Sequence, residues 1–184
     1  MGSGKRVVLL AVVMALAFCA GGCVDREVNG DESTYSFSWW VPTLATLAVV
    51  IGVPVGLLLR NVRTRRRAGW GVLVAVLIAG VGLVPSLFLD RVKVDSDHFE
   101  TRTGFWFAPT KHNVPFDGLG EIRYITYQTR GRRGRKTTKH KLVCVRDDGA
   151  VSDTVQLGDL ARRATPEILE RAQDRLIRVT TAQE

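Results

Sequence analysis

The fold is decided by one apolar segment, Trp39 to Leu59, which reads WWVPTLATLAVVIGVPVGLLL. As a helix, its 21 residues would be about 31 Å long, which matches the hydrocarbon core of a bilayer. Trp40 joins Trp39 at one end, where indole rings favour the membrane interface, and Arg60 closes the other end. Pro54 predicts a kink, which membrane helices tolerate when neighbouring groups satisfy the freed carbonyl. The segment therefore predicts a transmembrane helix over 39–59.

A second segment of the same kind follows after a short interruption. Ala68 to Leu89 reads AGWGVLVAVLIAGVGLVPSLFL, with Trp70 near its start and Asp90 just beyond its end. Its length and composition predict a second transmembrane helix over 69–89. The glycines at 71, 80 and 82 have two interpretations: they allow close approach to a partner helix, or they reflect the ordinary frequency of glycine in membrane helices.

The loop between the two segments orients them. Residues 60–68, RNVRTRRRA, hold five arginines and no acid. Short loops this positive stay in the cytoplasm, so 60–68 is predicted to be cytoplasmic. Residues 24–38, before the first helix, carry four acids and one arginine and are predicted to form an acidic extracytoplasmic segment. The chain after Leu89 then emerges outside the cytoplasmic membrane.

Residues 1–23, MGSGKRVVLLAVVMALAFCAGGC, combine two early cations, an apolar stretch and a small-residue ending. This is the plan of a secretory signal peptide, and the apolar stretch is short for a membrane span. The ending CAGGC resembles a bacterial lipoprotein processing site and makes Cys23 a lipidation candidate, although Ala20 stands where such sites usually carry Leu. Segment 1–23 is thus either a signal peptide, of general or lipoprotein type, or a retained N-terminal anchor. Both alternatives leave the chain after Leu89 outside.

The region 91–184 reads as a β domain. It has no long apolar run and alternates in short segments, RVKVDS, HFETRTGFWF, KHNVPF, EIRYITYQ, KLVCVR and AVSDTVQL. HFETRTGFWF is interpreted as two short pieces around Gly104, and the DDG before the last segment is typical of a hairpin turn. These patterns predict six or seven antiparallel strands.

The end of the chain has helical periodicity instead. In TPEILERAQDRLIRV, Thr165 is predicted to be the N-cap and Pro166 the first helical residue. One apolar stripe is formed by Ile168, Leu169, Ala172, Leu176 and Val179. We therefore expect one amphipathic helix that packs on the sheet.

Two membrane helices followed by short strands and a helix resemble the bacterial membrane-anchored PH-like domains. The resemblance is carried by VDSDHFETRTGFWF, VPFDGLGEIRY, and the succession LVCVRDDG, VQLGDL and helix. It implies a membrane α-helical hairpin plus a small antiparallel PH-like barrel with a C-terminal capping helix, of unknown function. Lipid-binding PH domains usually place their basic loop between the first two strands, whereas this chain places it late, between the predicted fifth and sixth. The resemblance therefore does not carry a phosphoinositide site over.

No catalytic or metal-binding motif stands out. His98, His112 and His140 are scattered over different segments without metal-ligand spacing, and the cysteines form no CxxC. No phosphate-binding GxxxxGK[ST] loop and no GxSxG elbow occurs. Cys144, between Val143 and Val145, is expected to be a small buried hydrophobe. The sequence thus predicts a protein that is not an enzyme and binds no cofactor.

The net charge is +8 and the pI is near 9.9. Two stretches are especially basic: the arginine loop and RGRRGRKTTKHK, Arg130 to Lys141. Gly131 and Gly134 let this stretch turn as a hairpin. Its candidate binding residues are Arg130, Arg132, Arg133, Arg135, Lys136, Lys139 and Lys141. The run is either a solvated hairpin tip or a contact for anionic lipid headgroups, an acidic partner protein or an anionic envelope polymer. Nucleic acid is disfavoured because no aromatic residue lies in the run to stack bases and because the tail faces outward.

The sequence therefore predicts a multi-pass protein of the bacterial cytoplasmic membrane with an extracytoplasmic β domain at 91–184. The expected role is binding or scaffolding through the basic hairpin. The alternative is a subunit of a membrane complex, a homo- or hetero-oligomer formed through the transmembrane helices, in which the β domain is purely structural.

Overall fold

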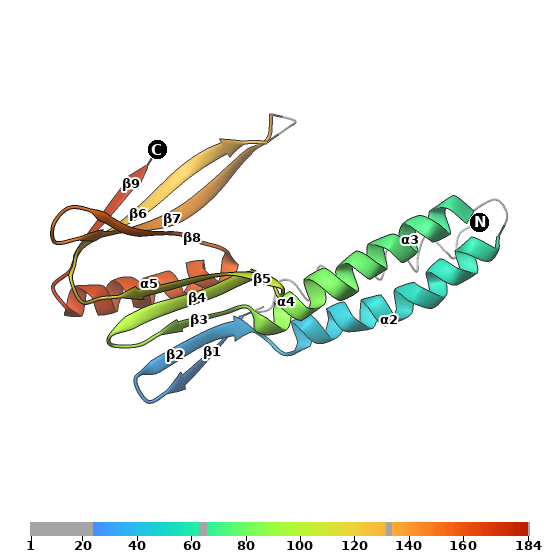
Figure 1. Ribbon diagram of the computed structural model, residues 1–184, viewed down its shortest axis with the longest axis horizontal. Coiled ribbons are helices and arrows are strands. Elements are labelled where there is room, and N and C mark those ends of the chain that lie inside the picture. The colour runs from blue at the N-terminus through green and yellow to red at the C-terminus, as the bar shows by residue number, and fades with distance from the viewer. Residues whose placement is uncertain (1–23, 63–65, 132–133, 184) are drawn as a thin grey trace.

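The computed structural model describes residues 24–62, 66–131 and 134–183. Two helical rods extend from one end of a β domain (Figure 1). The strands are β1 Val24–Asn29, β2 Glu32–Phe37, β3 Arg91–Val94, β4 His98–Phe105, β5 Ala108–Pro115, β6 Leu119–Arg130, β7 Lys136–Arg146, β8 Val151–Gln156 and β9 Arg178–Gln183. The helices are α2 Trp40–Asn61, α3 Arg66–Ile78, the π-helical turn η2 Ala79–Leu83, α4 Val84–Leu89 and α5 Asp159–Asp174.

The described residues contain two helices that are long and apolar enough to cross a membrane: Trp40–Asn61, and the continuous run Arg66–Leu89 through α3, η2 and α4. Their apolar side chains remain largely exposed to the surroundings. Glycine brings the two helices together, because a Cβ on Gly69 would lie 2.4 Å from the Arg60 backbone nitrogen and one on Gly52 would lie 2.4 Å from a Val76 methyl. Of the glycines noted in the sequence, Gly80 packs against Val49 in the same way, whereas Gly71 faces open space.

The first sheet combines strands that precede the two apolar helices in the chain with strands that follow them. Its strand order is β1-β2-β3-β4-β5, and every pair is antiparallel. The chain leaves β2 into α2 and returns from α4 into β3, where Ser36 is paired with Arg91. The segment 24–38, which the sequence predicts only as an acidic extracytoplasmic stretch, is thus a β-hairpin that turns at Gly30 with φ +65°. The β domain therefore includes residues outside the predicted range 91–184.

The second sheet has the order β8-β7-β6-β9. β6, β7 and β8 are antiparallel, as expected, but β9 runs parallel to β6. All six alternating segments form strands, and HFETRTGF continues as one strand through Gly104 rather than as two pieces. The predicted combination of two long apolar helices, antiparallel sheets and a helix near the C-terminus is confirmed.

One core joins both sheets and α5. Its fully buried side chains include Val92, Phe99, Ile122, Leu142 and Ile168. The sheets are also linked by a polar contact, His112 Nδ1 to Asp153 Oδ2 at 2.9 Å. Cys144 is buried among these residues as expected, and burial, assisted by the charge of Asp153, raises the pKa of its thiol to about 12.

The prediction for the last helix is wrong at both ends. α5 begins after Gly158, because Leu160 and Ala164 extend the buried stripe upstream of Ile168. Thr165 and Pro166 are therefore interior residues and not the N-cap and first turn.

The helix also ends before the predicted stripe does. Leu176 adopts φ +63°, its N–H donates to the Gln173 carbonyl, and the Ile177 N–H donates to the Ala172 carbonyl. This is a Schellman motif, and it redirects the chain into β9. Leu176 and Val179, predicted as members of the helical stripe, lie beyond its end.

Candidate functional site

The basic stretch forms a two-stranded ribbon that extends beyond the sheet. β6 and β7 pair from Leu119/Arg146 out to Arg130/Lys136. β9, however, flanks β6 only as far as Thr126, and β8 flanks β7 only from Lys141 onward. Residues 127–130 and 136–140, which we call the arm, therefore have no third strand beside them in the described part of the chain. The predicted hairpin is present, with Gly134 at φ +74° and the Gly131 N–H donating to the Arg135 carbonyl at 2.8 Å.

The arm brings several positively charged side chains close together. Arg130 and Lys136 are directly opposite across the two strands, an arrangement that destabilises a hairpin by repulsion. Both are exposed, as are Arg135 and Lys139. Lys141, at the base of the arm, is half-buried with its Nζ 5.2 Å from the centre of the Tyr127 ring. Arg132 and Arg133 lie outside the described residues.

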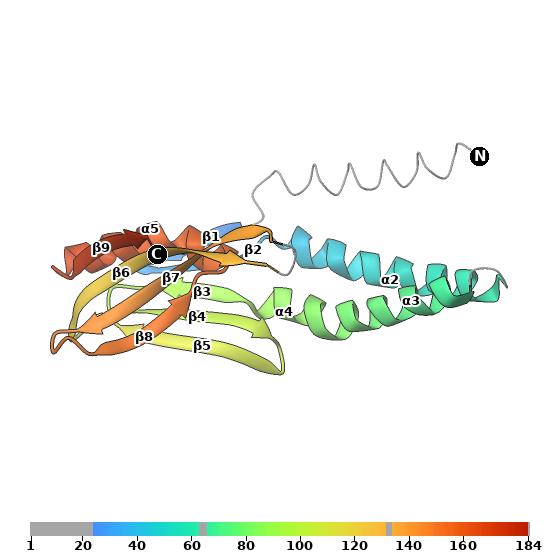
Figure 2. The same ribbon diagram turned by 90° about the horizontal axis from the view of Figure 1, so that it is seen from above.

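The arm ends at the same end of the β domain from which the helices extend. β6 runs from the far end of the β domain to the end from which α2 and α4 extend, and β7 begins there (Figure 1). The view from above agrees, with the ends of β6 and β7 level with the beginning of α2 (Figure 2). The end of the domain that carries the helices thus also carries the free end of the arm.

A second feature of this end is missed by sequence reasoning, which interprets GFWF only as strand residues. The turn between β4 and β5 is a cluster of three exposed aromatic residues, Phe105, Trp106 and Phe107, which we call the aromatic tip. It lies beside α4 (Figure 2). The signal available in the sequence was three consecutive aromatic side chains at a turn, where polar residues are usual.

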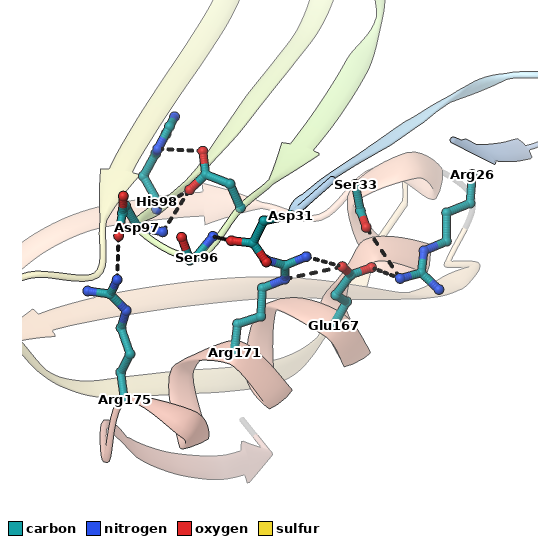
Figure 3. A network of polar contacts seen from close by, with 10 residues as sticks. Arg26, Asp31, Ser33, Ser96, Asp97, His98, Glu167, Arg171 and Arg175 are labelled. Atoms are coloured by element: carbon teal, nitrogen blue, oxygen red, sulfur yellow. Dashed lines mark hydrogen bonds and ion pairs between the residues drawn. The ribbon is translucent and has the colours of Figure 1, made fainter. Parts of the chain in front are cut away.

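A polar network between α5 and the β1–β2 hairpin has a structural role. Glu167, only 8% exposed, accepts a hydrogen bond from Arg171 and forms an ion pair with Arg26 at 2.9 Å (Figure 3). It also accepts a hydrogen bond from Tyr35. Burial disfavours its charge, but the hydrogen bonds from Tyr35, Ser33 and Arg171 outweigh burial and lower its pKa. The network ties α5 to the β1–β2 hairpin.

The groove above this network, about 340 Å³, is lined by charged residues that are already paired in part. Arg171 also contacts Asp31, and Arg175 contacts Asp97 and Asp117. Within the residues that the structure describes, no three His, Cys, Asp or Glu side chains gather in a way that could hold a metal ion. The groove therefore presents ion pairs between elements and no arrangement of acid, base and nucleophile.

No protein-family model matches this chain, and neither a curated protein nor a solved structure is significantly similar to it. Cys23, the lipidation candidate, lies outside the described residues.

Proposed function

We propose that this chain is a non-enzymatic, membrane-anchored binding protein that holds its β domain against the outer face of the cytoplasmic membrane. The arm contacts anionic lipid headgroups. The observation that carries this proposal is the position of the arm, whose exposed cations lie at the end of the domain from which the two apolar helices leave.

The energetics favour such a contact. Each cation near an anionic membrane surface contributes about 1 kcal/mol. The helices tether the domain, which raises the effective concentration of lipid at the arm, so weak attraction suffices. The repulsion between Arg130 and Lys136, unfavourable in the isolated hairpin, is relieved when both face phosphate groups.

The membrane placement combines the two apolar helices with the arginine loop at 60–68, which stays in the cytoplasm by the positive-inside rule. The fold supports the PH-like resemblance to the extent that two sheets and a helix enclose one core. Sidedness is tested by fusions at the C-terminus. An alkaline phosphatase fusion should be active and a green fluorescent fusion dark, and the reverse pattern would refute the topology.

The lipid contact is tested with the full chain reconstituted in vesicles. A fluorophore sensitive to its surroundings is placed on the arm at Thr138→Cys, with Cys19 and Cys23 changed to serine and Cys144 protected by burial. We expect a blue shift in vesicles that contain phosphatidylglycerol, compared with pure phosphatidylcholine. The shift should weaken at high salt, because salt screens exposed charges. A matched label at Asp148→Cys, beyond the other end of β7, should not respond.

The charges are tested by changing Arg130, Arg135, Lys136 and Lys139 to glutamine. This variant should lose the blue shift. A control variant with glutamine at Arg146, Arg162, Arg163 and Arg178 has the same net charge and should retain it. A label at Thr138 that ignores phosphatidylglycerol even without added salt would refute the lipid contact and leave an acidic partner protein as the ligand of the arm.

The second candidate function is assembly of a membrane complex through the helices. It is favoured by an apolar groove of about 450 Å³ along α2 and α3, lined by residues that include Val49, Val53, Trp70 and Leu77. A partner helix in this groove should be displaced by Val53→Trp. Cross-linking of the full chain in its native membrane, with and without this substitution, tests the assembly. An unchanged cross-linking pattern would refute it.

A further inference from the structure

The aromatic tip is fixed to the helix beside it. The indole N–H of Trp106 donates to the carbonyl of Val81 at 2.6 Å, and the backbone N–H of Trp106 donates to Ser86 Oγ at 3.2 Å. Pro85 has no N–H, so the Val81 carbonyl, four residues earlier, lacks its α-helical partner. The indole supplies the missing donor. The tip is therefore a docked element with a defined place along the helix.

That place lies within the apolar segment. Val81 is eight residues before Leu89, so the tip contacts the helix about 12 Å from its end. The surrounding helix surface is apolar and open, with Leu83 54% and Phe88 62% exposed. The tip itself continues this surface, since Phe105 is 54% and Phe107 64% exposed. In water these rings would be a costly patch, whereas aromatic rings favour the membrane interface.

A row of cations crosses the same sheet farther from the helices. Arg91, Arg102 and Lys111 are direct neighbours on β3, β4 and β5, on the face away from the core. Like charges opposite one another destabilise a sheet. Among the described residues no ion pair of the three within 4 Å is present. The charge of Arg102 acts on the nearby Asp90 carboxylate, and the Nε of Arg102 is buried without a hydrogen-bond partner. We call these three residues the cationic row.

The tip and the row are separated by a distance that suits a membrane surface. Arg102 precedes Trp106 by four residues, which is about 13 Å along a strand. With the rings about 5–8 Å inside the hydrocarbon, the cations lie at the level of the headgroups, because the polar layer on each side is about 5–8 Å thick. Between them a crevice of about 210 Å³ is lined by residues that include Leu83, Leu87, Asp90 and Phe105.

We propose that the aromatic tip and the cationic row form an interfacial site for an anionic phospholipid, in which the row binds the phosphate group and the tip and crevice receive the upper part of the acyl chains. This inference rests on the proposed membrane placement but is independent of the arm. The site would fix the tilt of the β domain, since it adds a second contact with the membrane besides the arm.

The first experiment measures lipid selectivity. The full chain is released from nanodiscs that contain equal amounts of phosphatidylglycerol and phosphatidylcholine, and the retained lipids are counted by native mass spectrometry. Changing Arg91, Arg102 and Lys111 to glutamine should lower the ratio of retained phosphatidylglycerol to phosphatidylcholine by at least about tenfold, because each cation near an anionic surface contributes about 1 kcal/mol. Lys93→Gln is the matched control, because Lys93 is on the same face of β3 and is already paired with Glu32.

The outcomes are distinct. Loss of selectivity in the row variant but not in Lys93→Gln supports the site. Equal ratios in the wild type, the row variant and the control would refute it, as would an equal loss in both variants. The single substitution Lys111→Gln changes only one exposed residue of β5, so it controls for a folding defect in the triple variant. It should give a partial loss of lipid selectivity. The label on the arm reports separately, so this site can fail while the arm contact holds.

The second experiment measures the depth of the tip. With Trp39, Trp40 and Trp70 changed to phenylalanine, Trp106 becomes the single indole in the chain. Its fluorescence should be quenched by lipids brominated near the top of the acyl chain and protected from aqueous iodide. Quenching by iodide with no effect of brominated lipid would place the tip in water and refute the proposal.

Discussion

At the residue scale, Leu176 is the clearest case of local strain. It occupies the left-handed position of the Schellman motif, where a side chain costs about 1–2 kcal/mol, and it is 94% exposed. Leu176→Gly should stabilise the fold by about 0.5–1 kcal/mol, after the entropic cost of glycine is subtracted. Chemical denaturation in mild detergent measures the change. Leu176→Ala keeps the strained backbone and should give no gain, so an equal gain from both substitutions would contradict this explanation.

The contact between Tyr35 and Glu167 predicts how stability depends on pH. Burial, together with the hydrogen bond and charge of Glu167, raises the pKa of Tyr35 from 10.0 to about 12. The folded state then holds this proton more tightly than the unfolded state, so stability is full below pH 10 and falls as pH rises toward 12. The lowered pKa of Glu167 acts on the acid side: stability is present above 4.5 and is lost as pH falls below it. Thermal unfolding between pH 3 and 12 should show both slopes. Tyr35→Phe should reduce the alkaline slope but not abolish it, because the raised pKa of the Cys144 thiol, also about 12, contributes to the same loss of stability.

At the element scale, Pro85 and Trp106 should be energetically coupled. Trp106→Phe removes the donor to the Val81 carbonyl and should cost about 1 kcal/mol. Pro85→Ala restores a backbone N–H that can reach the same carbonyl. In the Pro85→Ala background the cost of Trp106→Phe should therefore shrink, which a double-mutant cycle of unfolding free energies measures. Equal costs in both backgrounds would show that the indole does not replace the missing helix bond.

The elements also show which parts of the fold are readable from the sequence. The apolar helices and the strands from β3 to β8 follow from local patterns, namely long apolar runs and alternation. The bounds of α5 do not, because Leu160 and Ala164 belong to the helix only through the core that they bury in. β9 and the β1–β2 hairpin are polar on much of their surface, and both are strands because neighbouring strands supply their hydrogen bonds.

The candidate site, too, could be predicted only in part from the sequence. A dense cationic run with two glycines predicts a hairpin, but the direction of the arm depends on how β6 crosses the whole domain. The cationic row could not be predicted from the sequence, because Arg91, Arg102 and Lys111 become neighbours only through the register of three strands.

At the scale of the whole molecule, the β domain is a single unit whose strands come both before and after the two apolar helices in the chain. β2 and β3 are neighbours in the sheet although the two helices separate them in the chain. A fragment of residues 91–184 therefore lacks the hairpin that covers the edge of β3. It also removes Tyr35 and Arg26, two of the partners of Glu167, and leaves Arg171 as the partner that remains in the fragment. We expect this fragment to be unstable by itself.

The same register predicts how to obtain the domain without its helices. Ser36 pairs with Arg91, so Phe37 and Asp90 are the next positions, and an Asn-Gly turn between them should close a β2–β3 hairpin. A chain of residues 24–37, Asn-Gly and 90–184 should unfold cooperatively, as followed by circular dichroism, whereas 91–184 should not. Both chains carry serine at positions 105 to 107, because the helix that covers one side of the tip is absent. Equal stability of the two chains would mean that the first hairpin is accessory and that the C-terminal region folds without it.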